Sequence, residues 1–201
     1  MTLRGLLIDL DGTLADSLAA MRRVYGAFLE RYGFAGTDGE FEELNGPSLR
    51  EIIATLNDRH CLDGSHEELL GQYQGLVEKA YAQSVAPRDG AAELLDASAG
   101  LKLVLVTSAP RCVAEGFLVS HGWSNRFDVI VAGDEVSASK PDPAIYRLAL
   151  ERVGLAPDEA IAIEDSDAGE ASARGAGLRV WRADGGLTAV GERLEKERSV
   201  G

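Results

Sequence analysis

Residues 6–16 read Leu6-Leu7-Ile8-Asp9-Leu10-Asp11-Gly12-Thr13-Leu14-Ala15-Asp16. The apolar run at the start of this stretch predicts a buried strand, which ends in two carboxylates one residue apart. Because side chains alternate along a strand, we expect Asp9 and Asp11 to project to the same side. Two negative charges at one spot are costly unless a cation occupies the spot or one carboxyl keeps its proton. Gly12 permits a sharp turn and the close approach of a ligand.

The composition is that of an acidic globular protein. The chain has 201 residues, of which 45% are hydrophobic, and a formal net charge of −13. This length and apolar content suffice for one good-sized domain, or for a domain that carries a smaller insertion. The negative charge disfavours nucleic acids and anionic membranes as partners, because both require a basic face. An anionic substrate would therefore need positive charge supplied locally, by a metal, a lysine or helix N-termini.

The cysteine content and the apolar runs indicate where the protein works. Cys61 and Cys112 are far apart, so the sequence shows neither a disulfide framework nor a zinc-binding spacing, which fits a reducing compartment. Asp9 and Asp11 interrupt the first apolar run and make it a poor signal peptide. No uninterrupted apolar span approaches the length needed to cross a bilayer. We expect a soluble cytoplasmic protein, either a monomer or a homodimer.

A block of helices is predicted directly after the first strand. Apolar residues recur at helical spacing from Leu18 to Tyr32 and stop at Gly33. Ser48 and Ser65 each begin a capping box, with a glutamate three residues later and an apolar stripe beyond it. No convincing strand is found between Asp16 and Val85. We therefore predict an all-helical cap over residues 15–86.

The pattern changes at Pro87, where apolar runs that predict strands begin to alternate with helical patterns. The predicted strands cover 103–106, 129–131, 161–163 and 178–181, and the charged residues 192–201 are expected to fray. Strands that alternate with helices predict a parallel sheet covered on both faces. The fold class is thus α/β, a doubly wound parallel (Rossmann-like) sheet built from residues 1–14 and 87–201, with the all-helical cap inserted.

Chemically useful side chains follow four of the predicted strands. In an open α/β sheet, ligands bind outside the carboxyl ends of the strands, so these side chains are expected to converge. The residues concerned are Asp9 and Asp11, Thr107 and Ser108, Lys140, and Glu164 and Asp165. Asp134 and Glu135 also follow a strand, but we interpret them as ordinary loop acids outside the site.

In this order and spacing the motifs resemble those of the haloacid dehalogenase superfamily, in its branch with a helical cap after the first strand. The resemblance covers essentially the whole chain, and the first and last motifs are the most specific. The four matching segments are Asp9-Leu10-Asp11-Gly12-Thr13, Thr107-Ser108, Lys140-Pro141-Asp142-Pro143, and Glu164-Asp165-Ser166 with Gly169 beyond it.

The resemblance implies a Mg²⁺-dependent phosphatase that hydrolyses a small phosphorylated metabolite, similar to phosphoglycolate or a sugar phosphate. Asp9 would be the nucleophile and form an aspartyl-phosphate. Asp11 would protonate the leaving alkoxide and then activate water. Mg²⁺ would be held by the Asp9 carboxylate, the backbone carbonyl of Asp11 and the Asp165 carboxylate. Glu164 would lie behind these ligands or contact the metal through water.

The remaining candidates would bind the substrate. By the same resemblance, Thr107 and the amide of Ser108 would contact phosphate oxygens, and Lys140 would offset charge on Asp9 and on the transferred phosphoryl group. Arg50, at the start of a predicted cap helix, is our candidate to contact a second anionic group of the substrate. A surface position for Arg50 is the alternative.

Two other functions are alternatives to the phosphatase. A β-phosphoglucomutase-like phosphotransferase has a similar fourth motif but places a histidine twelve residues after the nucleophile, where this chain has Met21. A non-enzymatic phospho-acceptor signalling module would carry its aspartate after the third strand and have no cap. The acid at Asp11 favours phosphoesters over haloacids, because a halide leaves without protonation.

Overall fold

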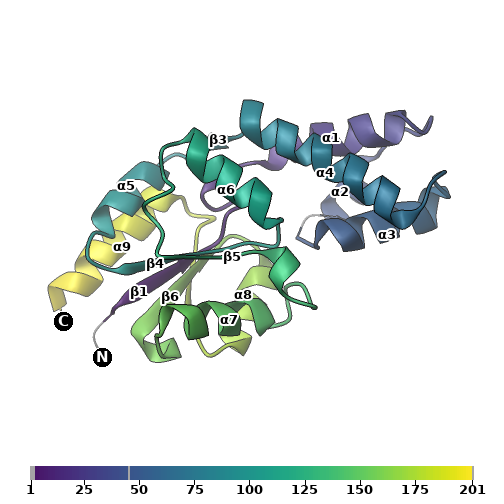
Figure 1. Ribbon diagram of the computed structural model, residues 1–201. Coiled ribbons are helices and arrows are strands. Elements are labelled where there is room, and N and C mark those ends of the chain that lie inside the picture. The colour runs from purple at the N-terminus through teal and green to yellow at the C-terminus, as the bar shows by residue number, and fades with distance from the viewer. Residues whose placement is uncertain (1–2, 45, 201) are drawn as a thin grey trace.

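Five strands in the order β5-β4-β1-β6-β7 form the central sheet, and all neighbours in it run parallel. Their bounds are β1 Gly5–Ile8, β4 Lys102–Val106, β5 Val129–Val131, β6 Ala160–Glu164 and β7 Arg179–Arg182. The structure is a computed structural model that describes residues 3–44 and 46–200. The predicted α/β class with a doubly wound parallel sheet is confirmed (Figure 1).

Helices cover both faces of this sheet. Leu6 and Ile8 of β1 pack into the same apolar cluster as α5 (Ala91–Ala97), α6 (Arg111–Ser120) and α9 (Leu187–Val200). Leu7, which points the other way, packs with α7 (Ala144–Val153) and α8 (Asp167–Gly175). The short 3-10 turns η1 (Gly133–Glu135) and η2 (Pro157–Glu159) complete the connections. Burial on both faces explains why the strands read as continuous apolar runs.

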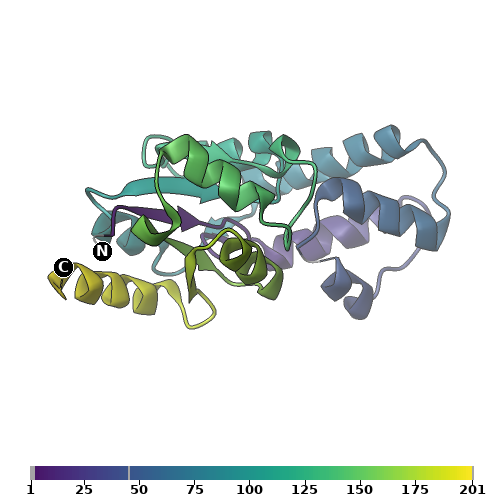
Figure 2. The same cartoon turned by 90° about the horizontal axis from the view of Figure 1, so that it is seen from below.

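Two short strands, β2 and β3, connect the core to an inserted group of four helices. We call these helices, α1 to α4, the helical block. The bounds are β2 Ala15–Asp16, α1 Leu18–Glu30, α2 Asp38–Glu43, α3 Leu49–His60, α4 His66–Gln83 and β3 Ala86–Pro87. The helical block projects from one end of the core, opposite both chain termini (Figures 1 and 2). Strands β2 and β3 pair antiparallel, with Ala15 opposite Pro87, so the two connections run side by side.

The predicted helix starts in this block are confirmed. Ser48 and Ser65 both form complete capping boxes, at the N-termini of α3 and α4. The buried stripe of α4 is Leu69, Tyr73, Val77 and Tyr81. Tyr81 thus continues the four-residue spacing of Leu69, Tyr73 and Val77 and is 3% exposed.

Three parts of the secondary structure differ from the prediction. Residues 15–86 are not all helical, because Ala15–Asp16 and Ala86 belong to the short strands β2 and β3. Helix α2 was not predicted, because it is short and acidic and has no buried residue. The expectation that 192–201 is frayed was wrong over the described part, since α9 runs to Val200. Leu194 is fully buried, and Arg198 donates to the carbonyls of Ala97 and Ala99 at 2.7 and 3.0 Å. Among the described helices, none combines the length and apolarity needed to cross a membrane.

Candidate active site

The turn after β1 brings Asp9 and Asp11 to the same place, for a reason other than strand alternation. Strand β1 ends at Ile8, and the Leu10 carbonyl accepts from the N–H groups of Leu14 and Ala15 at 2.9 and 2.8 Å. Asp11 therefore lies in a tight turn rather than on the strand. The expected alternation was the wrong explanation, although both carboxylates do line one cavity.

Gly12 is required in this turn by a close approach. Its φ is 78°, in the left-handed region that favours glycine. A Cβ at this position would collide with the carboxylate of Asp165. The next residue, Thr13, donates from Oγ1 to Asp165 Oδ1 at 3.3 Å. The Gly12-Thr13 pair thus lets the end of β6 come against the turn after β1.

A buried lysine lies between two buried carboxylates. Lys140 Nζ donates to Asp9 Oδ1 and to Glu164 Oε1, both at 2.6 Å. The side chain of Lys140 is 5% exposed, that of Asp9 7% and that of Glu164 0%. Burial alone would lower the pKa of Lys140, but the two carboxylates outweigh it and raise the pKa above its ordinary value. The lysine is therefore held charged beside Asp9.

One lysine does not balance the negative charge at this point. Oxygens of Asp9, Glu164 and Asp165 lie within 4.8 Å of one another. Burial and the charge of Glu164 raise the pKa of Asp9 despite Lys140, and the same two causes raise the pKa of Asp165. None of the described residues donates a hydrogen bond to the backbone carbonyl of Asp11. These hard oxygen donors with excess negative charge fit a magnesium ion.

Asp11 is held by the helical block as well as by the core. The hydroxyl of Tyr81, near the end of α4, donates to Asp11 Oδ1. From the core, Thr107 Oγ1 lies 3.5 Å from Asp11 Oδ2. The Asp11 carboxylate thus lies between two hydroxyl groups.

The segment after β4 places a hydroxyl and a turn beside these acids. Thr107 is fully buried, and its Oγ1 accepts from the N–H of Ala109 at 3.0 Å, which holds the turn. Ser108 lines the cavity. A Cβ at Gly133 would collide with the carbonyl of Ser108, so the glycine after β5 allows the two segments to touch.

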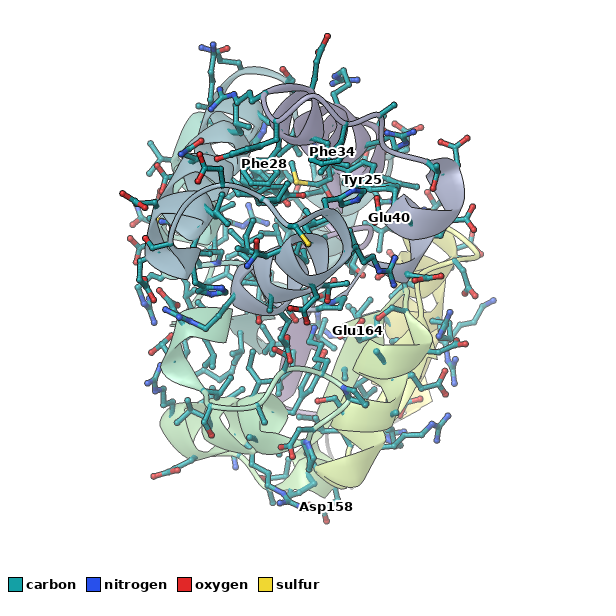
Figure 3. The ribbon with its side chains drawn as sticks, turned by 90° about the vertical axis from the view of Figure 1, so that its right-hand side faces the viewer. Tyr25, Phe28, Phe34, Glu40, Asp158 and Glu164 are labelled. Atoms are coloured by element: carbon teal, nitrogen blue, oxygen red, sulfur yellow. The ribbon has the colours of Figure 1, made fainter. Side chains whose placement is uncertain are left out.

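A cavity of about 170 Å³ lies between these core residues and the helical block. Its core side includes Asp9, Asp11, Ser108, Lys140 and Asp165. Figure 3 labels Glu164 where the helical block meets the core, whereas Asp158 lies at the far end of the core. The carboxyl ends of the strands thus open into the space beneath the helical block.

The structure brings the predicted site residues together, except for Arg50. Thr107 and Glu164 do not line the cavity but hydrogen-bond to residues that do, Asp11 and Lys140. Arg50 is not brought to the site. Its side chain is 61% exposed and pairs with Glu67 at 2.8 Å, and it is not among the residues that line the cavity.

Three contributors were missed by the sequence analysis. Tyr81 could have been found by continuing the four-residue spacing of α4. Tyr146 donates to Glu164 Oε1 at 2.6 Å, but its place in the apolar stripe of α7 made it indistinguishable from a core residue. Arg88 donates to the carbonyl of Gly12 from the segment after β3, where no motif marks it.

The loop acids after β5 have structural partners, as interpreted from the sequence. Asp134 accepts from the N–H of Arg111 at 3.2 Å, at the start of α6. Glu135 forms ion pairs with Arg111 at 2.6 Å and Arg152 at 2.5 Å.

Comparisons with known proteins agree on one family. A family model described as haloacid dehalogenase-like hydrolase matches residues 6–183. Protein CbbY of Rhodobacter capsulatus is 34% identical, over 90% of this chain and 85% of its own length. A phosphorylated carbohydrates phosphatase of Thermotoga maritima is 30% identical, over 88% and 82%. The crystal structure of CbbY from Rhodobacter sphaeroides in complex with phosphate superposes with a TM-score of 0.82 at 30% identity, covering 90% of this chain and 86% of that one.

Proposed function

The chain belongs to the haloacid dehalogenase-like hydrolase family, and we propose that it is a Mg²⁺-dependent phosphatase acting through an aspartyl-phosphate intermediate. Several of its relatives are named as phosphatases, which makes it a phosphoric monoester hydrolase. The proposed substrate is a small phosphorylated metabolite of the phosphoglycolate or sugar-phosphate kind. The observation that carries the proposal is Asp9, buried at the end of β1 and paired with Lys140 at 2.6 Å in a cavity that also holds Asp11.

In the first proposed step an oxygen of the Asp9 carboxylate attacks phosphorus. A bond forms between Asp9 and phosphorus as the ester bond to the leaving alkoxide breaks. Asp11 donates a proton to that alkoxide. In the second step Asp11 takes a proton from water, the water oxygen bonds to phosphorus, and phosphate leaves while Asp9 is regenerated.

Positive charge and hydrogen-bond donors hold the phosphoryl group during both steps. Lys140 lies 2.6 Å from Asp9 Oδ1 and so remains beside the transferred group. Thr107 and the backbone N–H of Ser108, which lines the cavity, would donate to phosphate oxygens. The carboxylates of Asp9 and Asp165 and the carbonyl of Asp11 would hold Mg²⁺, with Glu164 behind them. When bound, the metal neutralises negative charge on the phosphate oxygens.

One observation favours the phosphatase over a mutase-like phosphotransferase. Met21, at the position where those mutases carry a histidine, lines the cavity. Its thioether neither donates nor accepts a proton, so it cannot activate a hydroxyl of the substrate for the return transfer. Water then remains the acceptor of the phosphoryl group.

The proposed organisation follows from the same arrangement. Residues 15–86 would act as a mobile cap on the core of 1–14 and 87–201, closing to exclude water and opening to exchange substrate and product. The proposed location is the cytoplasm, since Cys61 and Cys112 are free, exposed thiols of a kind that a reducing compartment preserves.

The proposed function is tested by metal-dependent release of phosphate. The protein should hydrolyse p-nitrophenyl phosphate in the presence of Mg²⁺. Removal of divalent ions with EDTA should lower the rate at least about a hundredfold, because a metal that neutralises charge contributes several kcal/mol. Excess Mg²⁺ should restore the rate. Full activity in a metal-free preparation would contradict the proposed site.

The role of Asp11 is tested by its dependence on the leaving group. Asp11→Asn keeps the backbone carbonyl and an oxygen that can accept from Tyr81, but it cannot donate a proton. We expect kcat for an alkyl phosphate to fall about 10²-fold, the usual size of general acid–base catalysis. The fall for p-nitrophenyl phosphate in the transfer step should be smaller, because p-nitrophenolate leaves without protonation. Equal losses in the transfer step for both esters would refute the acid role.

A further inference from the structure

The part of the cavity formed by the helical block carries no charge among the described residues. Toward the core it contains Asp9, Asp11, Lys140 and Asp165, where phosphate and metal would lie. Toward the helical block it is lined mainly by carbon, including the side chains of Leu18, Met21, Phe41, Leu49, Ile52 and Val77. The two ends of one cavity therefore differ sharply in chemistry.

Three arginines of the helical block form ion pairs away from the cavity, and Arg23 and Arg31 do not line it either. Arg50 pairs with Glu67 at 2.8 Å, Arg22 with Asp38 at 2.8 Å and Arg59 with Glu43 at 2.5 Å. None of these three arginines is among the described residues that line the cavity. Asn45, which the structure does not describe, has an uncharged side chain.

Lys140 cannot act as counter-ion to a second anionic group at the apolar end, because its ammonium group is bonded within the core. Its Nζ bonds to Asp9 and Glu164, and its remaining hydrogen bond goes to the carbonyl of Val106 at 3.3 Å. A second anionic group at the far end of a substrate would therefore lie among apolar side chains with no counter-ion. Burying a charge without a partner is strongly unfavourable.

The helical block contacts the core at two points beside the cavity. Glu51, in the first turn of α3, interacts with Ser139, the residue before Lys140. Partial burial raises the pKa of Glu51, but hydrogen bonds from Ser139 and Ser48 outweigh this effect and leave it lowered. Tyr81 makes a second contact, to Asp11.

From this arrangement we propose that the enzyme selects phosphate monoesters whose alcohol part is uncharged and presents carbon to the helical block. Bisphosphates and phosphorylated carboxylic acids should be poorer substrates, so of the two kinds of metabolite proposed above phosphoglycolate is the disfavoured one. The inference rests on the proposed phosphatase function and narrows its substrate class. The hydroxyl groups of Ser17, Tyr73 and Tyr81 are the polar groups with which the described part of the block lines this cavity. They can hydrogen-bond to hydroxyl groups of an uncharged substrate.

A matched pair of substrates tests this selectivity in the unmodified protein. One is butyl phosphate, and the other is the analogue in which the terminal methyl is replaced by a carboxylate. With Mg²⁺ present, kcat/KM for butyl phosphate should exceed that of the analogue by at least about tenfold, since the carboxylate would be buried unpaired. Equal values, or a preference for the carboxylate, would overturn the proposal.

Variants at two neighbouring positions, Leu49 and Arg50, test whether charge on the cavity wall decides the selectivity. Leu49→Arg places a cation on the wall of the cavity and should shift the ratio at least about tenfold toward the carboxylated ester. Leu49→Gln, which is polar but neutral, should not produce this shift. Arg50→Ala removes the adjacent, exposed arginine and should leave the ratio of the two substrates unchanged. If Arg50→Ala selectively weakens the carboxylated ester, Arg50 reaches the substrate and the inference is wrong.

The control reaction separates this inference from the proposed function. If wild-type protein releases no phosphate from p-nitrophenyl phosphate with Mg²⁺, the phosphatase itself is refuted. If it hydrolyses p-nitrophenyl phosphate but prefers the carboxylated ester, the phosphatase stands and only the uncharged-substrate inference falls. Thermal unfolding of the Leu49 variants shows whether each one is folded before its ratio is compared.

Discussion

Asp9→Asn should abolish turnover, with kcat lower by about 10⁴-fold or more, as expected for the loss of a nucleophile. The amide keeps the size of the carboxylate and an oxygen that can still accept from Lys140, so the site should remain folded. It lacks the negative charge needed to attack phosphorus. The measurement is phosphate release from p-nitrophenyl phosphate, together with acid-quenched mass spectrometry of the protein during turnover.

The mass measurement makes this test specific. Wild-type protein should carry a covalent phosphate on the peptide that contains Asp9, and Asp9→Asn should carry none. Asp134→Asn is the matched control, because Asp134 also follows a strand but is exposed and interacts with Arg111. The control should retain full activity. Substantial turnover by Asp9→Asn would sink the assignment of the nucleophile.

Lys140→Met should damage both activity and stability. The substitution removes the only cation among the described lining residues, so kcat should fall about 10³-fold, the upper range for the loss of one electrostatic contact. It also leaves Asp9 and Glu164 buried beside each other. Breaking a buried ion pair from one side typically costs about 3–5 kcal/mol. Urea unfolding without added metal should show a loss of this size in the free energy of unfolding.

The chain offers a matched control for this loss. Lys102 pairs with Asp128 at the same distance, 2.6 Å, but the lysine side chain is 56% exposed. Lys102→Met should cost no more than about 1 kcal/mol, because solvent screens exposed pairs. If the two variants lost equal stability, burial of the Lys140 pair would not matter energetically.

Much of the core arrangement could be predicted because it depends on local pattern. Continuous apolar runs followed by polar residues marked β1, β4 and β6, and strand ends in a parallel sheet face one edge. Asp9, Lys140 and Asp165 could therefore be grouped from the sequence, because each follows a strand of the same sheet. Capping boxes at Ser48 and Ser65 likewise depend on a short stretch of sequence.

The contacts that were missed depend on distant parts of the chain. Tyr146 and Tyr81 look like core residues, since an aromatic ring at helical spacing packs equally well with or without a partner for its hydroxyl. Whether that hydroxyl meets Glu164 or Asp11 depends on how helices dock. Arg50 is the opposite case, a residue that was predicted to reach the site and does not. Its place near a helix start does not reveal which way the guanidinium points. Only the ion pair with Glu67 shows this.

The pairing of β2 with β3 has a consequence for how such enzymes diversify. Ala15 lies opposite Pro87, and the Arg88 N–H donates to the Leu14 carbonyl at 2.8 Å. The chain therefore leaves and re-enters the core at the same point. Because the entropic cost of closing a loop grows only slowly with its length, an insertion at this point can vary in length at little cost. Evolution can exchange the inserted module and so retune the accepted alcohol while the catalytic scaffold is inherited intact. In this chain the inserted module also supplies a donor to Asp11, the hydroxyl of Tyr81.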